Sequence, residues 1–200
     1  MNNKMLEMAK ELVQMLEEEK SQEMVKLSEF KKGDTFTTDI GKFIVLYPGI
    51  DHVGVTTEDL FRKNMKFDDD TMDYSKSTLK KLCDSEILKE FEEVFGTENI
   101  IQHEVDLTSV DMQKDCGTVD CKVRPLTFDE VRQYNDLLVN KDLEDWYWTV
   151  TPWSTPERGW EYSVAVVSPS GNIVNYCCCG HGDVRPFCIL NSNIFVSKGE

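Results

Sequence analysis

The 200-residue chain carries 37 acidic and 22 basic residues, which gives a formal net charge of −15 at pH 7. This charge argues against direct contact with DNA or RNA, because phosphate binding needs clustered Lys and Arg. Hydrophobic residues make up 40% of the chain, and no apolar run approaches the roughly 20 residues that cross a bilayer, so we expect a soluble cytoplasmic protein without membrane contact.

The first expected element is an amphipathic helix within residues 1–28. Met5, Met8, Leu12 and Met15 recur at spacings of three and four, which places them on one apolar stripe. The stripe covers about two heptads, which is shorter than the three or four that indicate a coiled coil. Packing on its own domain, docking in a partner's groove and a homodimer through these four residues all remain open.

The remainder, residues 29–200, is expected to form one α+β domain. Its first part predicts a β-hairpin. Gly33-Asp34 and Asp39-Ile40-Gly41 supply turn residues, and Phe43 to Tyr47 is rich in strand-forming side chains.

An acidic stretch at 67–73 predicts a loop, and a helical pattern follows it. One short apolar face ends at Cys83. Asp84 or Ser85 is then expected to cap a second helix, which Gly96 ends.

The second half predicts strands around one clear helix start. Residues 100–107 alternate as a strand does, and Thr127 with Glu130 forms a capping box. From Trp146 onward short strands and turns dominate, and the turn at 169–172 joins two of them into a hairpin.

The stretch NYCCCGHGDVRPFC (175–188) holds four of the seven cysteines. In a reducing cytosol we expect free thiols. Neighbours on a strand point to opposite faces, so Cys177 and Cys179 are expected to share a face that Cys178 does not. These residues lack the usual spacing of a zinc site, and we expect no metal and no cofactor. A ligand set of Cys177, Cys179, His181 and Cys188 stays open as an alternative.

Aromatic residues cluster between positions 146 and 162. Alternation places Trp146 and Trp148 on one face of a strand, where we expect them in the core, and Tyr147 on the other face. Trp153 lies in a loop and is a better candidate for a surface contact. Exposed Trp and Tyr on a β scaffold are typical of binding sites for proteins or sugars.

The order of short motifs from about residue 30 to 196 resembles a bacterial and prophage domain family of unknown function. The family's pattern includes a Gly-Asp-Thr strand, a Tyr-x-x-Ser-x-Leu helix, a Trp-x-x-x-Ser-Pro block and a closing Gly-Val-Arg-Pro. The corresponding stretches here are Gly33–Thr35, Tyr74–Leu82, Pro125–Val131, Tyr147–Pro152 and Asp183–Phe187. Val150 and Asp183 depart from that pattern, since the family has Arg and Gly at these positions.

The closing block resembles the end of C-type-lectin-like domains, including those related to formylglycine-generating enzymes. This resemblance implies a C-type-lectin-like α+β fold with helices on a small twisted antiparallel sheet. It implies no calcium requirement, and binding rather than catalysis. It also places the turn before Asp183 on an outward face and gives Arg185 a structural part in tying the last strand to its neighbours.

We therefore expect a non-enzymatic, phage- or mobile-element-encoded protein-binding module without catalytic residues. Its charge suggests a basic partner, for example a nucleic-acid-binding host-defence nuclease such as a CRISPR effector, which it would inhibit. A carbohydrate-binding domain is the first alternative, and a cysteine- or metal-dependent enzyme is the second. The candidate binding residues are Trp153, Glu157, Arg158, Trp160, Tyr176, Cys178, His181 and Asp183.

Overall fold

The computed structural model describes residues 6–8, 10 and 24–198. Most of the expected N-terminal helix lies outside these residues, including Met5, Leu12 and Met15 of its apolar stripe. Residues 6–8 and 10 are helical, and Met8 is exposed. No helix in the described part of the chain has both the length and the apolar character needed to cross a membrane.

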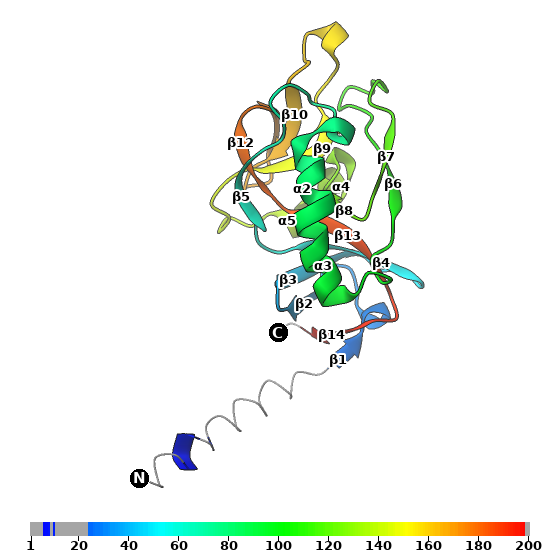
Figure 1. The fold of residues 1–200 in the computed structure, drawn as a ribbon, viewed down its shortest axis with the longest axis vertical. Helices are drawn as coiled ribbons and strands as arrows, with labels where there is room; N and C mark the ends of the chain where they lie inside the picture. The colour runs from blue at the N-terminus through cyan, green and yellow to red at the C-terminus, as the bar shows by residue number, and fades with distance from the viewer. Residues whose placement is uncertain (1–5, 9, 11–23, 199–200) are drawn as a thin grey trace.

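The described chain is α+β, and antiparallel pairing dominates its sheets (Figure 1). The larger sheet is antiparallel throughout. In spatial order its strands are β1 (Met24–Lys26), β14 (Phe195–Lys198), β2 (Thr35–Thr38), β3 (Gly41–Tyr47), β4 (His52–Thr57), β13 (Pro186–Asn191) and β8 (Val123–Pro125).

The predicted hairpin is confirmed by β2 and β3, which meet at the Asp39-Ile40 turn. Strand β1 and the fully buried Leu27 belong to the larger sheet and its core. Both lie before the domain boundary expected between residues 28 and 29, so the sheet domain includes residues from Met24 onward.

A second sheet of five strands carries the cysteine-rich stretch. Its order is β11 (Ile173–Cys177), β10 (Ser163–Val167), β9 (Tyr147–Pro152), β12 (His181–Val184) and β5 (Arg62–Lys66). Strands β9 and β12 run parallel, and the other pairs are antiparallel. The predicted turn at 169–172 joins β10 to β11. A separate hairpin pairs β6 (His103–Asp106) with β7 (Thr118–Cys121) and confirms part of the strand predicted at 100–107.

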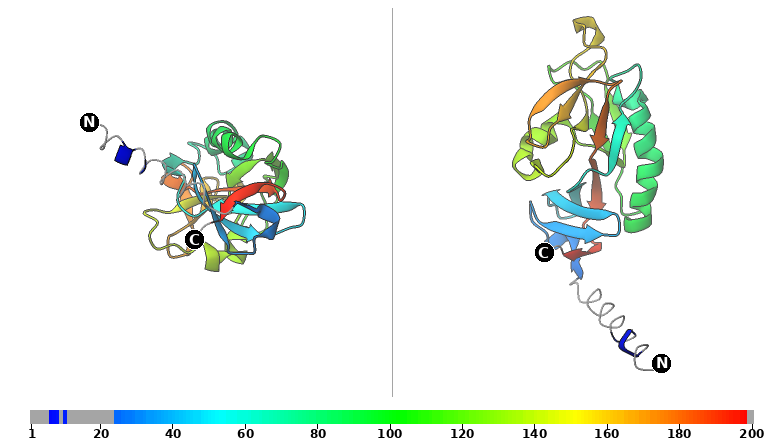
Figure 2. Two further views of the ribbon diagram at one scale, coloured as in Figure 1. Left: turned by 90° about the horizontal axis from the view of Figure 1, so that it is seen from below. Right: turned by 90° about the vertical axis from the view of Figure 1, so that its left-hand side faces the viewer.

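One long helical run lies along both sheets (Figure 2). It joins α2 (Thr78–Leu82), the π-helical turn η3 (Cys83–Ile87) and α3 (Leu88–Phe95) without a break. The prediction of two helices with a new cap at Asp84 or Ser85 is wrong. The run is capped once, by Ser77, whose side chain accepts from the Lys80 amide at 3.1 Å. Gly96 ends it at a φ of 82°, as predicted.

The position of this cap can be tested by two serine substitutions. Ser77→Ala is expected to lower the free energy of unfolding by about 1 kcal/mol, because an orphan amide of the first turn loses its acceptor. Ser85→Ala is the matched control and should stay within about 0.5 kcal/mol, because the exposed Ser85 hydroxyl donates only to the Lys81 carbonyl. Urea unfolding measures both, and equal effects would contradict the single cap.

Strand β3 is buried on both faces, and its alternating side chains enter two separate cores. Phe43 and Val45 pack with the long helix, where Phe91 and Phe95 meet the Phe43 ring edge to face. Ile44 and Leu46 pack on the opposite face. The larger sheet is therefore a central layer between two sets of helices.

The second face is covered by α4 (Phe128–Gln133) and α5 (Asn135–Leu138). The capping box predicted at the start of α4 is present, with Thr127 and Glu130 in their expected roles. Short 3-10 turns complete the described elements: η1 (Leu27–Glu29), η2 (Tyr74–Lys76) and η4 (Pro156–Arg158).

Near its C-terminal end the chain passes directly from the smaller sheet into the larger one. The run of chain that joins them consists of β12 and β13, which are separated only by Arg185. The Arg185 side chain is fully buried. Its Nε donates to the Thr57 carbonyl at 2.8 Å and its Nη1 to the Leu138 carbonyl at 2.7 Å. Arg185 thus ties this run to β4 and to α5, as expected for a structural arginine.

Candidate binding recess

The smaller sheet carries a recess of about 270 Å³ on one face. Its lining comes from strands β10, β11 and β12 and from the two residues that precede β9: Asp145, Trp146, Val166, Val174, Tyr176, His181 and Gly182. Gly182 contributes no side chain, and a Cβ there would lie 3.2 Å from the Trp148 indole. The absence of a side chain at Gly182 therefore lets β12 lie close to the Trp148 indole.

Two exposed aromatic residues line the recess from different strands. Trp146 is 38% exposed and Tyr176 is 47% exposed. Tyr176 rests on Trp148, with 5.8 Å between ring centroids. Trp148 is fully buried and donates from its indole nitrogen to the Met65 carbonyl at 2.8 Å. The exposed Tyr176 ring is thus supported by the buried Trp148 ring, which its hydrogen bond to Met65 holds in place.

The edge of the recess beside Trp146 is acidic. Asp145 lines it, and the preceding exposed segment includes Asp142 and Glu144. Hydrogen bonding and attraction from Lys63 hold the pKa of Glu144 below its ordinary value. A surface that combines aromatic faces with carboxylates suits a cationic group.

The structure places half of the candidate residues on the projecting loop that carries η4 (Figure 1). Trp153 is half-buried, whereas Glu157, Arg158 and Trp160 are exposed. Arg158 donates to Asp111 at 2.7 Å. Hydrogen bonds from Ser109 and Ser154, together with Arg158, hold the pKa of Asp111 below its ordinary value. None of these four candidates lines the recess.

The other four candidates lie on the turn and strands at 176–183. Tyr176 and His181 are exposed and line the recess together. Cys178 and Asp183 are buried, at 0% and 2% exposure, so these two candidate binding residues do not face the surface, and the outward position expected for the turn does not hold for Cys178. The Asp183 carboxylate accepts a hydrogen bond from the amide of Asn64, whose φ of 58° is left-handed. Asp183 therefore stabilises the backbone of β5. Burial raises the pKa of Asp183.

Trp146 was wrongly predicted as a core residue. Strand β9 begins one residue later, at Tyr147, so Trp146 does not follow the alternation of the strand. The other two aromatic predictions are confirmed, because Trp148 and Tyr147 are buried in different clusters on opposite faces. The signal that could have placed Trp146 at the surface is its position directly after the polar segment 140–145.

The thiols behave differently from the expectation that all seven are free. Cys177 and Cys179 form a disulfide, and the other five are free. Burial raises the pKa of every free thiol, to about 12 for Cys83 and about 11 for both Cys116 and Cys121. Thiols of this kind are poor nucleophiles near neutral pH.

His103 is half-buried in strand β6. Burial lowers the pKa of His103, and the Arg124 charge beside it adds to this effect. Within residues 6–8, 10 and 24–198, no group of three or more His, Cys, Asp or Glu side chains is placed to hold a metal ion.

Comparison with known proteins yields no relative for this chain. No family model, no curated protein and no solved structure matches it.

Proposed function

We propose that this chain is a non-enzymatic protein-binding module whose aromatic recess receives a Lys or Arg side chain from a basic segment of its partner. The observation that carries the proposal is the pairing of Trp146 and Tyr176 across one recess with Asp145 at its edge. Aromatic faces attract cations, and a nearby carboxylate adds a second attraction. The net charge of −15 favours the same kind of partner at longer range.

The size of the recess is compatible with one side chain of a partner. Its volume of about 270 Å³ lies below the roughly 300–1,000 Å³ of pockets that enclose a drug-sized molecule. A single lysine or arginine side chain at the centre of a wider contact surface suits this volume. Such anchor residues supply much of the binding energy of protein interfaces.

The fold and origin of the module are part of the same proposal. The ordered motifs from Gly33 to Phe187 support a C-type-lectin-like domain of phage or mobile-element origin. Within that setting, an acidic module would inhibit a basic host protein, such as a nucleic-acid-binding defence nuclease, by covering its basic surface. The raised pKa values of the five free thiols add support for a binding role over cysteine catalysis.

The recess can be tested with a short acetylated peptide that carries one Lys between Gly and Ser residues, followed by NMR titration. Tyr176→Ala and Trp146→Ala should each weaken binding about 3-fold to 30-fold, which is the effect of a lost cation–aromatic contact. Tyr162→Ala and Trp160→Ala are matched controls, because these residues are 47% and 41% exposed but do not line the recess. Both controls should bind as the parent protein does.

The same titration separates the alternatives. A peptide with norleucine in place of Lys should not bind, and added salt should weaken the Lys peptide. Loss of binding in Trp160→Ala alone would move the contact to the η4 loop and contradict the recess. Binding on a glycan array that Trp146→Ala abolishes, with no response to the Lys peptide, would support the carbohydrate-binding alternative instead.

A further inference from the structure

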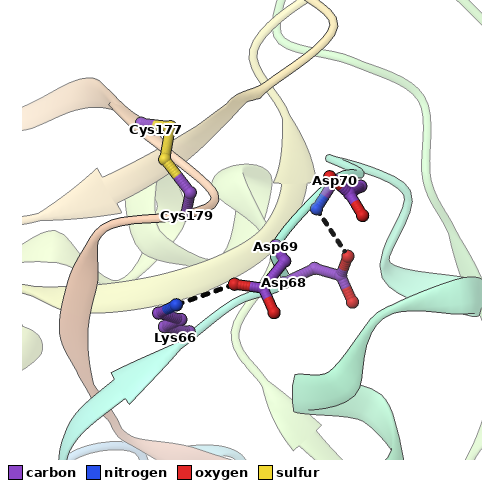
Figure 3. The surroundings of a disulfide bond; sticks show 6 residues. All are labelled: Lys66, Asp68, Asp69, Asp70, Cys177 and Cys179. Carbon is purple, nitrogen blue, oxygen red and sulfur yellow. Dashed lines mark hydrogen bonds and ion pairs between the residues drawn. A yellow bond between two sulfur atoms is a disulfide. The ribbon is translucent and has the colours of Figure 1, made fainter.

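The turn between β11 and β12 contains a disulfide that spans one residue. Cys177 and Cys179 are bonded across Cys178, with their Cα atoms 5.3 Å apart (Figure 3). Cys179 is exposed, Cys177 is half-buried and Cys178 is fully buried. Burial also raises the pKa of the Cys178 thiol. The sulfur atoms that a reagent in solution can reach in this turn are therefore those of the disulfide.

This turn is joined directly to two residues of the recess. Tyr176 precedes Cys177, and His181 follows Gly180. The Gly180 amide donates to the Cys177 carbonyl at 2.8 Å. The Tyr176 ring lies so close to Gly180 that a Cβ there would collide with it. The small ring closed by the disulfide thus lies in the short connection between Tyr176, which pairs with Val164 in β10, and His181, which pairs with Lys66 in β5.

The middle of the turn is fastened to the neighbouring acidic loop. The Cys178 carbonyl accepts from the amides of Phe67 and Asp68, at 3.2 and 3.1 Å. Asp69 and Asp70 of this loop are exposed beside the disulfide, and Lys66 is paired with Asp69 at 2.7 Å (Figure 3). Opening the disulfide would therefore leave Cys178 anchored and Cys177 paired with Ser163, while Cys179 and Gly180 lose their covalent link to Cys177 and gain freedom.

We propose that the Cys177–Cys179 disulfide is a thiol–disulfide exchange site for small thiols and that its redox state controls the recess. The thiolate of a small thiol attacks the exposed Cys179 sulfur, the disulfide bond breaks, and Cys177 leaves as a thiolate that takes a proton from water. A second thiol attacks the mixed disulfide and releases Cys179 and the oxidised small molecule. The protein gains two electrons and two protons, and two small thiols become one disulfide.

The surroundings of the site select among small thiols by charge. The three carboxylates of Asp68, Asp69 and Asp70 outnumber the single Lys66 charge that is paired with Asp69, so this loop repels an approaching anion and attracts a cation. Cysteamine and mercaptoacetate are compared at equal thiolate concentration, and the rate of each at this site is divided by its rate with an uncharged model disulfide. This relative rate should be higher for cysteamine than for mercaptoacetate. Added salt should reduce this preference.

Alkylation with iodoacetamide tests the site without any ligand. The untreated, denatured protein should take up five groups, and the protein reduced under native conditions and then denatured should take up seven. The two added groups should map to Cys177 and Cys179. Seven groups without reduction would overturn the proposal. Cys116→Ser is the control, because it removes a free thiol elsewhere and should lower both counts by one.

Amide hydrogen exchange and the Lys peptide test the link to the recess. Reduction, or the double substitution Cys177→Ser with Cys179→Ser, should speed exchange at Gly180 and His181 about tenfold or more. If the open turn holds the binding arrangement for a third of the time, the Kd of the peptide rises about threefold. Unchanged exchange at both amides would overturn the control of the recess.

The binding part of this inference rests on the proposed function, and the two can fail separately. If the peptide binds neither form but exchange at Gly180 responds to reduction, the proposed function fails and the redox site stands. If the peptide binds both forms equally and exchange does not respond, the proposed function stands and the redox control fails.

Discussion

Replacing Glu130 with alanine is expected to lower the free energy of unfolding by about 3–5 kcal/mol, because it leaves the buried Arg124 charge without a partner. The Nη1 and Nη2 atoms of Arg124 each donate to one oxygen of the Glu130 carboxylate at 2.7 Å, and the Arg124 side chain is only 4% exposed. The substitution also removes the acceptor of the Thr127 amide and so breaks the capping box.

Two further variants make the Glu130 prediction specific. Arg132→Ala removes an exposed ion pair with Asp129 on the same helix and should lower the free energy of unfolding by less than about 0.5 kcal/mol. Arg124→Met combined with Glu130→Leu removes both buried charges and should be less damaging than Glu130→Ala alone. Chemical denaturation of the three variants measures these differences. A double variant as unstable as the single one would argue against an uncompensated charge as the cause.

The pH dependence of this ion pair follows from the pKa of Glu130. Burial by itself would raise that pKa, but attraction and hydrogen bonds from Arg124 and hydrogen bonds from Thr127 outweigh it and hold the pKa below 4.5. A carboxyl group with a lowered pKa stabilises the fold above its unfolded-state pKa and loses this effect as the pH falls through its folded-state pKa. The difference in stability between the parent protein and Glu130→Gln should therefore shrink below about pH 4.5.

Trp148→Ala is expected to lower the free energy of unfolding by about 3–5 kcal/mol, because it opens a large cavity beside Phe67 in the core of the smaller sheet. The indole is fully buried and packs on Phe67 with ring centroids 5.6 Å apart. Its hydrogen bond to the Met65 carbonyl is also lost. Thermal or denaturant unfolding measures the effect.

The matched control for Trp148 is Trp160→Ala. Trp160 is 41% exposed and should change stability by less than about 0.5 kcal/mol. Trp148→Phe should recover part of the loss, because it refills most of the cavity without restoring the hydrogen bond. Similar losses in Trp148→Ala and Trp160→Ala would show that the cavity beside Phe67 is not the cause.

Local signals in the sequence predicted the hairpin at β2 and β3, the Thr127 capping box, the Gly96 helix stop and the turn at 169–172. Each of these depends on residues a few positions apart, so the information lies within one short window. The opposite burial of Tyr147 and Trp148 was predictable for the same reason, since alternation within a strand is local.

The features that build the recess depend on contacts between distant residues. Gly182 lies beside Trp148 only because β12 pairs with β9, and no local pattern indicates that parallel pairing. The expectation that Trp146 is buried is wrong because alternation within a strand does not indicate which residues a neighbouring element covers, and Trp146 stands just before the first residue of β9, where it is 38% exposed. The disulfide was not predicted, because a reducing cytosol favours free thiols. The local signal for it was the shared strand face expected for Cys177 and Cys179.

The run of β12 and β13 around Arg185 also has a consequence during synthesis. Strand β13 joins β4 to β8 in the larger sheet, and β12 joins β9 to β5 in the smaller one. Both are made after every strand that they connect. In a nascent chain that ends before His181, each of the two sheets is therefore still divided into separate sets of strands with open hydrogen-bonding edges, which other chains can pair with. The joining of β4 to β8 and of β9 to β5 has to wait for residues 181–191, so chaperone protection during translation is most valuable in the interval before they emerge from the ribosome.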